Sequence, residues 1–347
     1  MKKEMLTGLS KPGRITLAAL LMCTVLVSGC IGIIEPDITT GTLDSGTTTD
    51  NTTIYLPPLE YEYSGLVVIN DVERSFVIHI GSSYDATKPT PLVFVLHGGG
   101  STGENMAAFT GFNTIADREN FIVVYPEGIE NHWNDGREPK VYRTHLENTD
   151  DVGFISSLID ALSVGLNIDK NMIYVTGISN GGMMAHRLAC ELSDRIAAIA
   201  PVASSMPSNM VDEWEPSNPV SILIINGTDD PVVPWEGNEA TLDETNLGNM
   251  VPIESVMEFW TGKNGCLAEP EITWIPERNL TDGTTVWMET YSGCSDGVEV
   301  VLLGIDGGGH TWPGACQYAD ESIIGKTSLE FDASETIWEF FKEHPMN

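Results

Sequence analysis

Residues 173–182 have the pattern of a strand that passes through a turn into a helix: Ile173-Tyr174-Val175-Thr176-Gly177-Ile178-Ser179-Asn180-Gly181-Gly182. It contains G-x-S-x-G with the serine at the turn. A strand that turns sharply into a helix brings backbone against backbone, and the glycines leave room for that approach. We therefore expect Ser179 to stand at the end of its strand as a nucleophile. A glycine-rich turn without chemistry is the alternative.

Apolar patterns on both sides of this stretch predict the fold class. Continuous apolar runs are typical of strands buried on both faces, and they lie at 91–96, 121–125, 172–176, 197–202 and 221–225. Helical patterns lie near 105–117, 155–162, 183–188, 256–261 and 337–342. An alternating pair at 66–69 and 76–80 predicts a β-hairpin turning at Asn70 and Asp71. The order implies an α/β fold, a mostly parallel sheet with helices on both faces.

Composition excludes several classes of protein. The 347 residues include 17 Lys or Arg and 50 Asp or Glu, which gives a formal net charge of −33. A chain so acidic is not expected to bind nucleic acid. The hydrophobic content of 41% is that of a chain with a large core, which excludes disorder of the whole chain. A solvated surface explains the acidic excess, with adaptation to salt or cation binding as the alternative.

Residues 1–29 have the pattern of an export signal. Basic residues precede an apolar run at 15–27, which is shorter than the about 20 residues of a membrane-spanning helix. Val27-Ser28-Gly29-Cys30 resembles the lipobox of prokaryotic lipoproteins. It predicts cleavage before Cys30, acylation of that thiol and attachment to a membrane. The expected location is therefore extracytoplasmic, as a cell-surface or outer-membrane lipoprotein; an ordinary signal and a secreted protein are the alternative.

Two further segments complete the expected organisation. Residues 30–60 are rich in Thr, Gly, Ser and Asp and lack periodic apolar residues, which is typical of a tether. From residue 61 strands and helices alternate without a second linker. We expect one catalytic domain at 61–347.

A second glycine cluster, His97-Gly98-Gly99-Gly100, follows the strand at 91–96. Acyl transfer through a serine needs two backbone N–H groups about 3 Å from the carbonyl oxygen as it becomes negative. Asn180, the residue after the nucleophile, is expected to supply one. Gly99, or Gly98 as the alternative, is expected to supply the other. His97 is expected to have a structural role.

Position along the chain narrows the candidates for the base and the acid. In a fold of this kind an acidic residue follows a later strand and the histidine comes last. Asp229 and Asp230 both follow the strand at 221–225. Of the seven histidines, His310 alone lies after them in a glycine-rich loop, since His344 belongs to the tail.

Together G-I-S-N-G-G, H-G-G-G, G-T-D-D-P-V-V-P and G-G-G-H-T-W-P-G resemble the polyhydroxybutyrate depolymerase and feruloyl esterase family of α/β-hydrolases over residues 61–342. The resemblance implies that Ser179 is the nucleophile and His310 the base. Asp230 becomes the orienting acid because the family's aspartate precedes the Pro-Val-Val-Pro run, with Asp229 as the alternative. The implied substrate is an ester, polymeric or not: a polyester, or a feruloyl or acetyl ester of plant polysaccharide. No cofactor is implied.

Two tryptophans are candidate substrate-binding residues. Trp133 and Trp312 lie in loops expected near the mouth of the site and are candidate platforms for an aromatic acyl group or a sugar; ordinary half-buried tryptophans are the alternative. Cys266 and Cys294 flank a strand expected at 285–288, and an exported compartment permits oxidation, so we predict that they pair.

The remaining sequence patterns leave alternatives open. Cys190 is expected to be a buried thiol, and a bond to Cys316 is the alternative. No His or Cys cluster has the spacing of metal ligands, so no metal site is predicted. Two other functions remain possible at this point, a serine peptidase of the same fold and a catalytically silent surface-binding lipoprotein.

Overall fold

A computed structural model describes residues 46–49, 52–55, 62–69, 72–242, 245–266 and 269–347. The predicted signal peptide, Cys30, most of the tether and the turn at 70–71 lie outside the described residues. Among the described helices, none is long and apolar enough to span a membrane.

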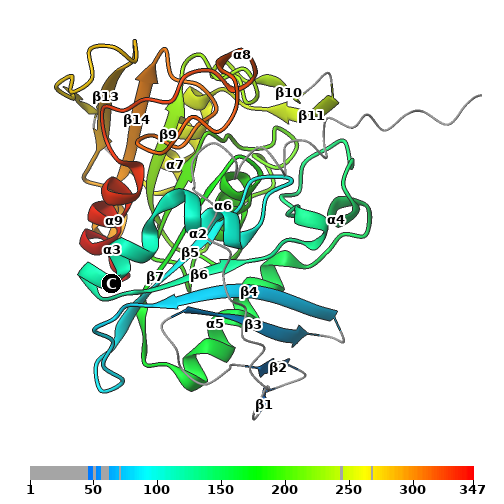
Figure 1. The fold of residues 1–347 in the computed structure, drawn as a ribbon. Coiled ribbons are helices and arrows are strands. Elements are labelled where there is room, and N and C mark those ends of the chain that lie inside the picture. The colour runs from blue at the N-terminus through cyan, green and yellow to red at the C-terminus, as the bar shows by residue number, and fades with distance from the viewer. Residues whose placement is uncertain (1–45, 50–51, 56–61, 70–71, 243–244, 267–268) are drawn as a thin grey trace, which may run out of the picture.

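A twelve-stranded sheet forms the centre of the molecule (Figure 1). Its order is β1-β2-β3-β4-β6-β5-β7-β8-β9-β14-β13-β12. The central strands run parallel: β6 (Ile122–Pro126), β5 (Thr90–Leu96), β7 (Ile168–Ile178), β8 (Ala198–Val202), β9 (Ser221–Gly227) and β14 (Val300–Asp306). Antiparallel strands flank them: β1 (Gly46–Thr49), β2 (Thr52–Tyr55), β3 (Glu62–Ile69) and β4 (Val72–Ile80) on one side, β13 (Thr285–Tyr291) and β12 (Glu271–Trp274) on the other.

Helices cover both faces of this sheet and bury its apolar side chains. One core lies under α5 (Asp151–Gly165), α6 (Asn180–Glu191) and α7 (Ile253–Lys263). The other lies under α2 (Gly103–Thr110), α3 (Phe112–Glu119) and α9 (Ala333–Glu343). The remaining helices are short: α4 (Arg143–Leu146), α8 (Glu321–Ile324), η1 (Ile129–Asn131) and η2 (Ser295–Gly297). The α/β-hydrolase fold predicted from the sequence is confirmed, because buried parallel strands alternate with helices as the patterns indicate.

Three parts of the structure differ from the sequence-based prediction. Strands β1 and β2 lie within the segment 30–60 that was expected to be a tether, and β2 pairs with β3 at one side of the sheet. These strands are rich in threonine, which is β-branched and suits a strand without giving an apolar pattern. The single helix expected at 105–117 is two helices, α2 and α3, which meet at Gly111 with φ of 70°. That left-handed backbone favours glycine and ends the first helix. The hairpin of β10 (Asn238–Leu242) and β11 (Thr245–Met250) was not predicted, because its strands carry polar residues on both faces and a bulge interrupts their register.

The fold gathers the candidate residues at one edge of the sheet. Gly99 follows β5, Ser179 follows β7, Asp230 follows β9 and His310 follows β14. These four strands run in the same direction. Residues beyond their carboxyl ends therefore lie at the same edge, which is where α/β sheets place their sites.

Candidate active site

Ser179 occupies a sharp turn between β7 and α6. Its backbone has φ of 56° and ψ of −123°, a conformation that costs free energy for any residue with a side chain. The surrounding structure holds it, because the Ser179 N–H donates to the carbonyl of Val202 at 3.0 Å. At Gly181 a Cβ would lie 2.5 Å from the carbonyl oxygen of Leu96, so only glycine fits there. The turn leaves Ser179 half-buried at the end of its strand.

His310 and Asp230 form a buried pair on neighbouring loops. Nδ1 of His310 lies 2.8 Å from Oδ2 of Asp230. The other oxygen, Oδ1, accepts hydrogen bonds from the N–H groups of Val232 and Val233, each at 2.8 Å. Three contacts therefore fix the carboxylate. Asp229, the neighbouring acid, is exposed.

A second contact holds the histidine loop itself. The Tyr318 hydroxyl donates to the backbone carbonyl of His310 at 2.7 Å. The hydrogen bonds of the described residues do not include one between Ser179 Oγ and His310. The structure thus contains the acid–base pair already formed, and it places the serine at the same edge of the sheet.

Two backbone amides adjoin Ser179. Asn180 follows it directly and is the first residue of α6. In the loop after β5, an ideal Cβ position on Gly98 lies 3.6 Å from Ser179 Cβ, and one on Gly99 lies 3.8 Å from Asn180 Cβ. Within the described residues, no protein acceptor takes a hydrogen bond from the Gly99 or Asn180 N–H. The amide end of α6 adds a favourable partial charge.

His97 is a structural residue, as the sequence predicts. Its buried ring accepts a hydrogen bond from the Gly128 N–H at Nε2, at 2.9 Å, and its Nδ1 lies 2.9 Å from the carbonyl of Gly98. This pattern requires a neutral imidazole with the proton on Nδ1. Burial lowers the pKa of His97 from an ordinary 6.5 to about 4, so the ring stays neutral around neutral pH.

A buried charged cluster beside Asn180 was missed from the sequence. The Asp135 carboxylate lies 3.3 Å from Nε of Arg137 and 3.2 Å from Nε2 of His145, and all three side chains are buried. Burial alone raises the pKa of Asp135, but Arg137 and His145 oppose it and bring that pKa below its ordinary value. No apolar periodicity marks these residues, so only the structure shows that they are buried together.

The predicted role of two tryptophans is corrected. Trp133 is 0% exposed and Trp312 is 1% exposed, so neither presents a ring to a substrate. The Trp133 indole N–H donates to the carbonyl of His97 at 2.9 Å, and that of Trp312 donates to the Ser334 hydroxyl at 3.0 Å. The sequence places both in loops beside the site, but the loops turn these rings into the interior, where each indole finds an acceptor.

A small apolar cluster adjoins the catalytic loops. Met183 lies one turn after Ser179, and Val232 and Val233 follow Asp230. They are buried together with Ala240, Leu247 and Met250 of the β10–β11 hairpin. The hairpin thereby covers apolar side chains that follow Ser179 and Asp230 in the chain. Two surface hollows of about 470 and 530 Å³ lie elsewhere, and Ser179 lines neither.

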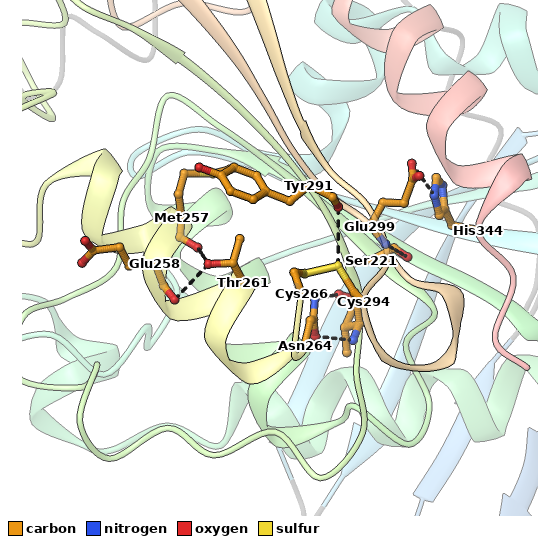
Figure 2. Close-up of a disulfide and its surroundings, with 11 residues drawn as sticks. Ser221, Met257, Glu258, Thr261, Asn264, Cys266, Tyr291, Cys294, Glu299 and His344 are labelled. Carbon is orange, nitrogen blue, oxygen red and sulfur yellow. Dashed lines mark hydrogen bonds and ion pairs between the residues drawn. A yellow bond between two sulfur atoms is a disulfide. The ribbon is translucent and has the colours of Figure 1, made fainter. Parts of the chain in front are cut away.

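The disulfide predicted between Cys266 and Cys294 is present (Figure 2). It joins the segment after α7 to the segment before β14. Asn264 beside it bonds the backbone of Val220, just before β9. The bond therefore lies at the opposite edge of the sheet from Ser179. Cys190 is a free, buried thiol, so the alternative bond to Cys316 does not form.

Within the described residues no group of three or more His, Cys, Asp or Glu is arranged to hold a metal ion. The groups at the carboxyl ends of the parallel strands are a serine, an imidazole paired with a carboxylate, and backbone amides.

Comparison with known proteins places this geometry in a family. The model of the esterase PHB depolymerase family matches residues 75–208. NocK of Nocardia uniformis subsp. tsuyamanensis, whose name marks it as an esterase, is 31% identical over 280 residues, which are 79% of this chain and 80% of NocK. The chain belongs to the esterase PHB depolymerase family. It is a carboxylic ester hydrolase.

Other relatives of this chain carry more specific names. Feruloyl esterase C of Emericella nidulans is 28% identical, over 77% of this chain and 83% of that enzyme. Feruloyl esterase B of Piromyces equi is also 28% identical, over 68% of this chain but only 42% of its own length. Among solved structures, the acetyl xylan esterase from Aspergillus awamori has a TM-score of 0.51 and 14% identity, over 78% of this chain and 94% of that one. That likeness concerns the fold.

Proposed function

We propose that this esterase works through an acyl-enzyme on Ser179, with His310 as base and Asp230 as the orienting acid. The observation that carries the proposal is the 2.8 Å contact between His310 Nδ1 and Asp230 Oδ2. It leaves Nε2 as the basic nitrogen of the ring. The strained turn that presents Ser179 at the same edge supports the nucleophile.

The proposed reaction has two steps. His310 Nε2 takes the proton of Ser179 Oγ as that oxygen attacks the ester carbonyl, and the N–H groups of Gly99 and Asn180 stabilise the negative oxygen. His310 then gives the proton to the leaving alcohol. A water molecule, activated in the same way, releases the acid and restores the serine. Asp230 holds the tautomer and the orientation of the imidazole throughout. The missing contact between Ser179 and His310 is expected to form with substrate, since catalytic hydrogen bonds tighten in complexes.

The proposed substrate is an ester carried by plant polysaccharide, with a feruloyl or acetyl acyl group, and a hydroxyalkanoate polyester is the alternative. The names of the relatives, feruloyl esterases among them, support this choice.

A substrate panel tests this choice. It contains a feruloyl sugar, acetylated xylan, polyhydroxybutyrate and a peptide amide, each assayed with the wild type and Ser179→Ala. Hydrolysis of the polysaccharide esters by the wild type alone is expected. Hydrolysis of the peptide amide, with none of the esters hydrolysed, would overturn the proposal.

We further propose an exported lipoprotein, with a signal at 1–29, acylation at Cys30, a tether at 30–60 of which 46–49 and 52–55 are bound to the sheet as β1 and β2, and a catalytic domain at 61–347. The support comes from the sequence pattern around Cys30. Metabolic labelling with an alkyne fatty acid should mark the native chain, and Cys30→Ser should abolish the label and release an active enzyme. An unlabelled native chain would contradict the anchor.

A further inference from the structure

We propose that Asp135 is a positioning residue that fixes the two halves of the oxyanion hole relative to each other. The inference rests on the proposed function of Gly99 and Asn180. Those two amides come from separate elements, the loop after β5 and the first residue of α6. Because a displaced donor stabilises an oxyanion poorly, something must hold the two elements in register.

The segment 131–135 contacts the Gly99 loop on one side. The Gly100 N–H donates to the carbonyl of Asn131 at 2.8 Å, and the Trp133 indole donates to the carbonyl of His97 at 2.9 Å. The His132 ring lies 3.2 Å from the position that a Cβ on Gly99 would take. Three successive contacts therefore tie this segment to the loop that carries the Gly99 amide.

The same segment contacts the Asn180 side chain on the other side. Oδ1 of Asn180 accepts from the Trp133 N–H at 2.8 Å, and Nδ2 donates to the Trp133 carbonyl at 3.1 Å. Nδ2 also donates to Oδ2 of Asp135 at 2.6 Å. The side chain of the residue after the nucleophile is thus saturated by one stretch of backbone and one carboxylate.

The carboxylate is the strongest of these contacts, because a bond to a charged acceptor is about twice as strong as a neutral one. Arg137 and His145 lie beside Asp135 in the interior, and the Arg137 N–H donates to Oδ1 at 3.2 Å. Their presence allows a carboxylate to be buried at the turn behind Ser179. Asp135 does not touch the reacting atoms and acts through Asn180.

The proposal predicts a particular kinetic pattern. An oxyanion exists in the tetrahedral intermediate and not in the bound ester, so loosening its donors lowers kcat and leaves KM nearly unchanged. A trifluoromethyl ketone adds to a serine hydroxyl and places an oxyanion in the same position. Its affinity should fall together with kcat, whereas the loss of a merely structural contact lowers the melting temperature and spares both.

The experiment is a double-mutant cycle with Asp135→Asn, Asn180→Ala and the pair, assayed on a chromogenic acetate ester and with the trifluoromethyl ketone. Each single change should lower kcat and the ketone affinity by about 10- to 100-fold, less than the complete loss of a donor. The double variant should be no less active than Asn180→Ala alone, because that change already removes the bond between Asn180 and Asp135 together with the two bonds to Trp133. Glu330→Gln is the matched control, since Glu330 is also buried and accepts hydrogen bonds from the backbone N–H groups of Arg278 and Asn279, which belong to neither half of the proposed oxyanion hole.

Additive losses in the cycle, or an unchanged kcat in Asp135→Asn, would overturn the proposal. If Asp135→Asn does not fold, Asn180→Ala alone decides: its kcat must fall with KM unchanged. Ser179→Ala distinguishes a failure of the proposed mechanism from a failure of the proposed role of Asp135. An active Ser179→Ala would contradict the proposed mechanism, whereas an inactive one beside a fully active Asn180→Ala would contradict only the role of Asp135.

Discussion

Oδ2 of Asp230 lies 2.8 Å from Nδ1 of His310, although 80 residues separate them in the chain. Asp229, one position earlier, is exposed to solvent. The turn after β9 leaves Asp229 at the surface and buries Asp230, whose carboxylate is held against the imidazole by the N–H groups of Val232 and Val233.

This geometry predicts unequal effects of two conservative changes. Asp230→Asn should lower kcat by up to about 10⁴-fold, because an amide in that position favours the wrong tautomer of His310. Asp229→Asn should leave kcat within about 3-fold, as expected for a surface change. Steady-state assays of both purified variants provide the measurement. If Asp229→Asn proved the more damaging, the acid would be misassigned.

Acid conditions should destabilise the protein through His97. Burial lowers the pKa of this ring to about 4, against an ordinary 6.5, so between those values the unfolded chain binds a proton that the folded one does not. The free energy of unfolding should therefore rise as pH increases from about 4 to 6.5 and then level off with respect to this group.

Urea unfolding of the wild type and His97→Asn at several pH values tests this linkage. In the variant, the slope of the free energy of unfolding against pH should be smaller by the equivalent of about one bound proton. His186, which is also buried with a pKa of about 3, contributes with the same sign and remains in both proteins. Parallel curves for the two proteins would show that His97 is not the group responsible.

The disulfide should support stability without affecting turnover. Cys266 and Cys294 are 28 positions apart, and linking them restricts the unfolded chain by roughly 3.5 kcal/mol in the chain-entropy model. Because the bond lies at the edge of the sheet away from Ser179, the Cys266→Ser, Cys294→Ser double variant should melt several degrees lower and keep kcat at low temperature. A large loss of kcat in the cold, folded variant would mean that the bond controls the catalytic edge.

Much of the fold follows from patterns that depend on neighbours in the chain. Buried parallel strands are continuous apolar runs, and G-x-S-x-G at the end of such a run predicts the turn at Ser179. Gly111 divides a predicted helix because a left-handed residue is a local event that apolar spacing does not reveal. The β10–β11 hairpin is stabilised by the cluster it covers, so its own sequence shows little alternation.

The site depended more strongly on tertiary structure. Residues alone left Asp229 and Asp230 equivalent, and a resemblance was needed to choose between them. Trp133 and Trp312 lie in the expected loops, but whether a ring faces solvent depends on acceptors such as the His97 carbonyl, contributed by distant segments. The burial of Asp135 has the same origin, because Arg137 and His145 offset its desolvation only once the chain has folded.

Hydrolysis through an acyl-enzyme on Ser179 can be tested by trapping that intermediate. The protein is mixed with excess feruloyl ester, quenched in acid within the first turnovers and digested for mass spectrometry. We expect one feruloyl group per chain on the peptide that contains Ser179, and none in Ser179→Ala. That variant should also lose about 10⁴- to 10⁶-fold in kcat. Turnover of the ester by the wild type without an acylated peptide would show that Ser179 does not carry the acyl group. A label on another residue that persists in Ser179→Ala would show the same.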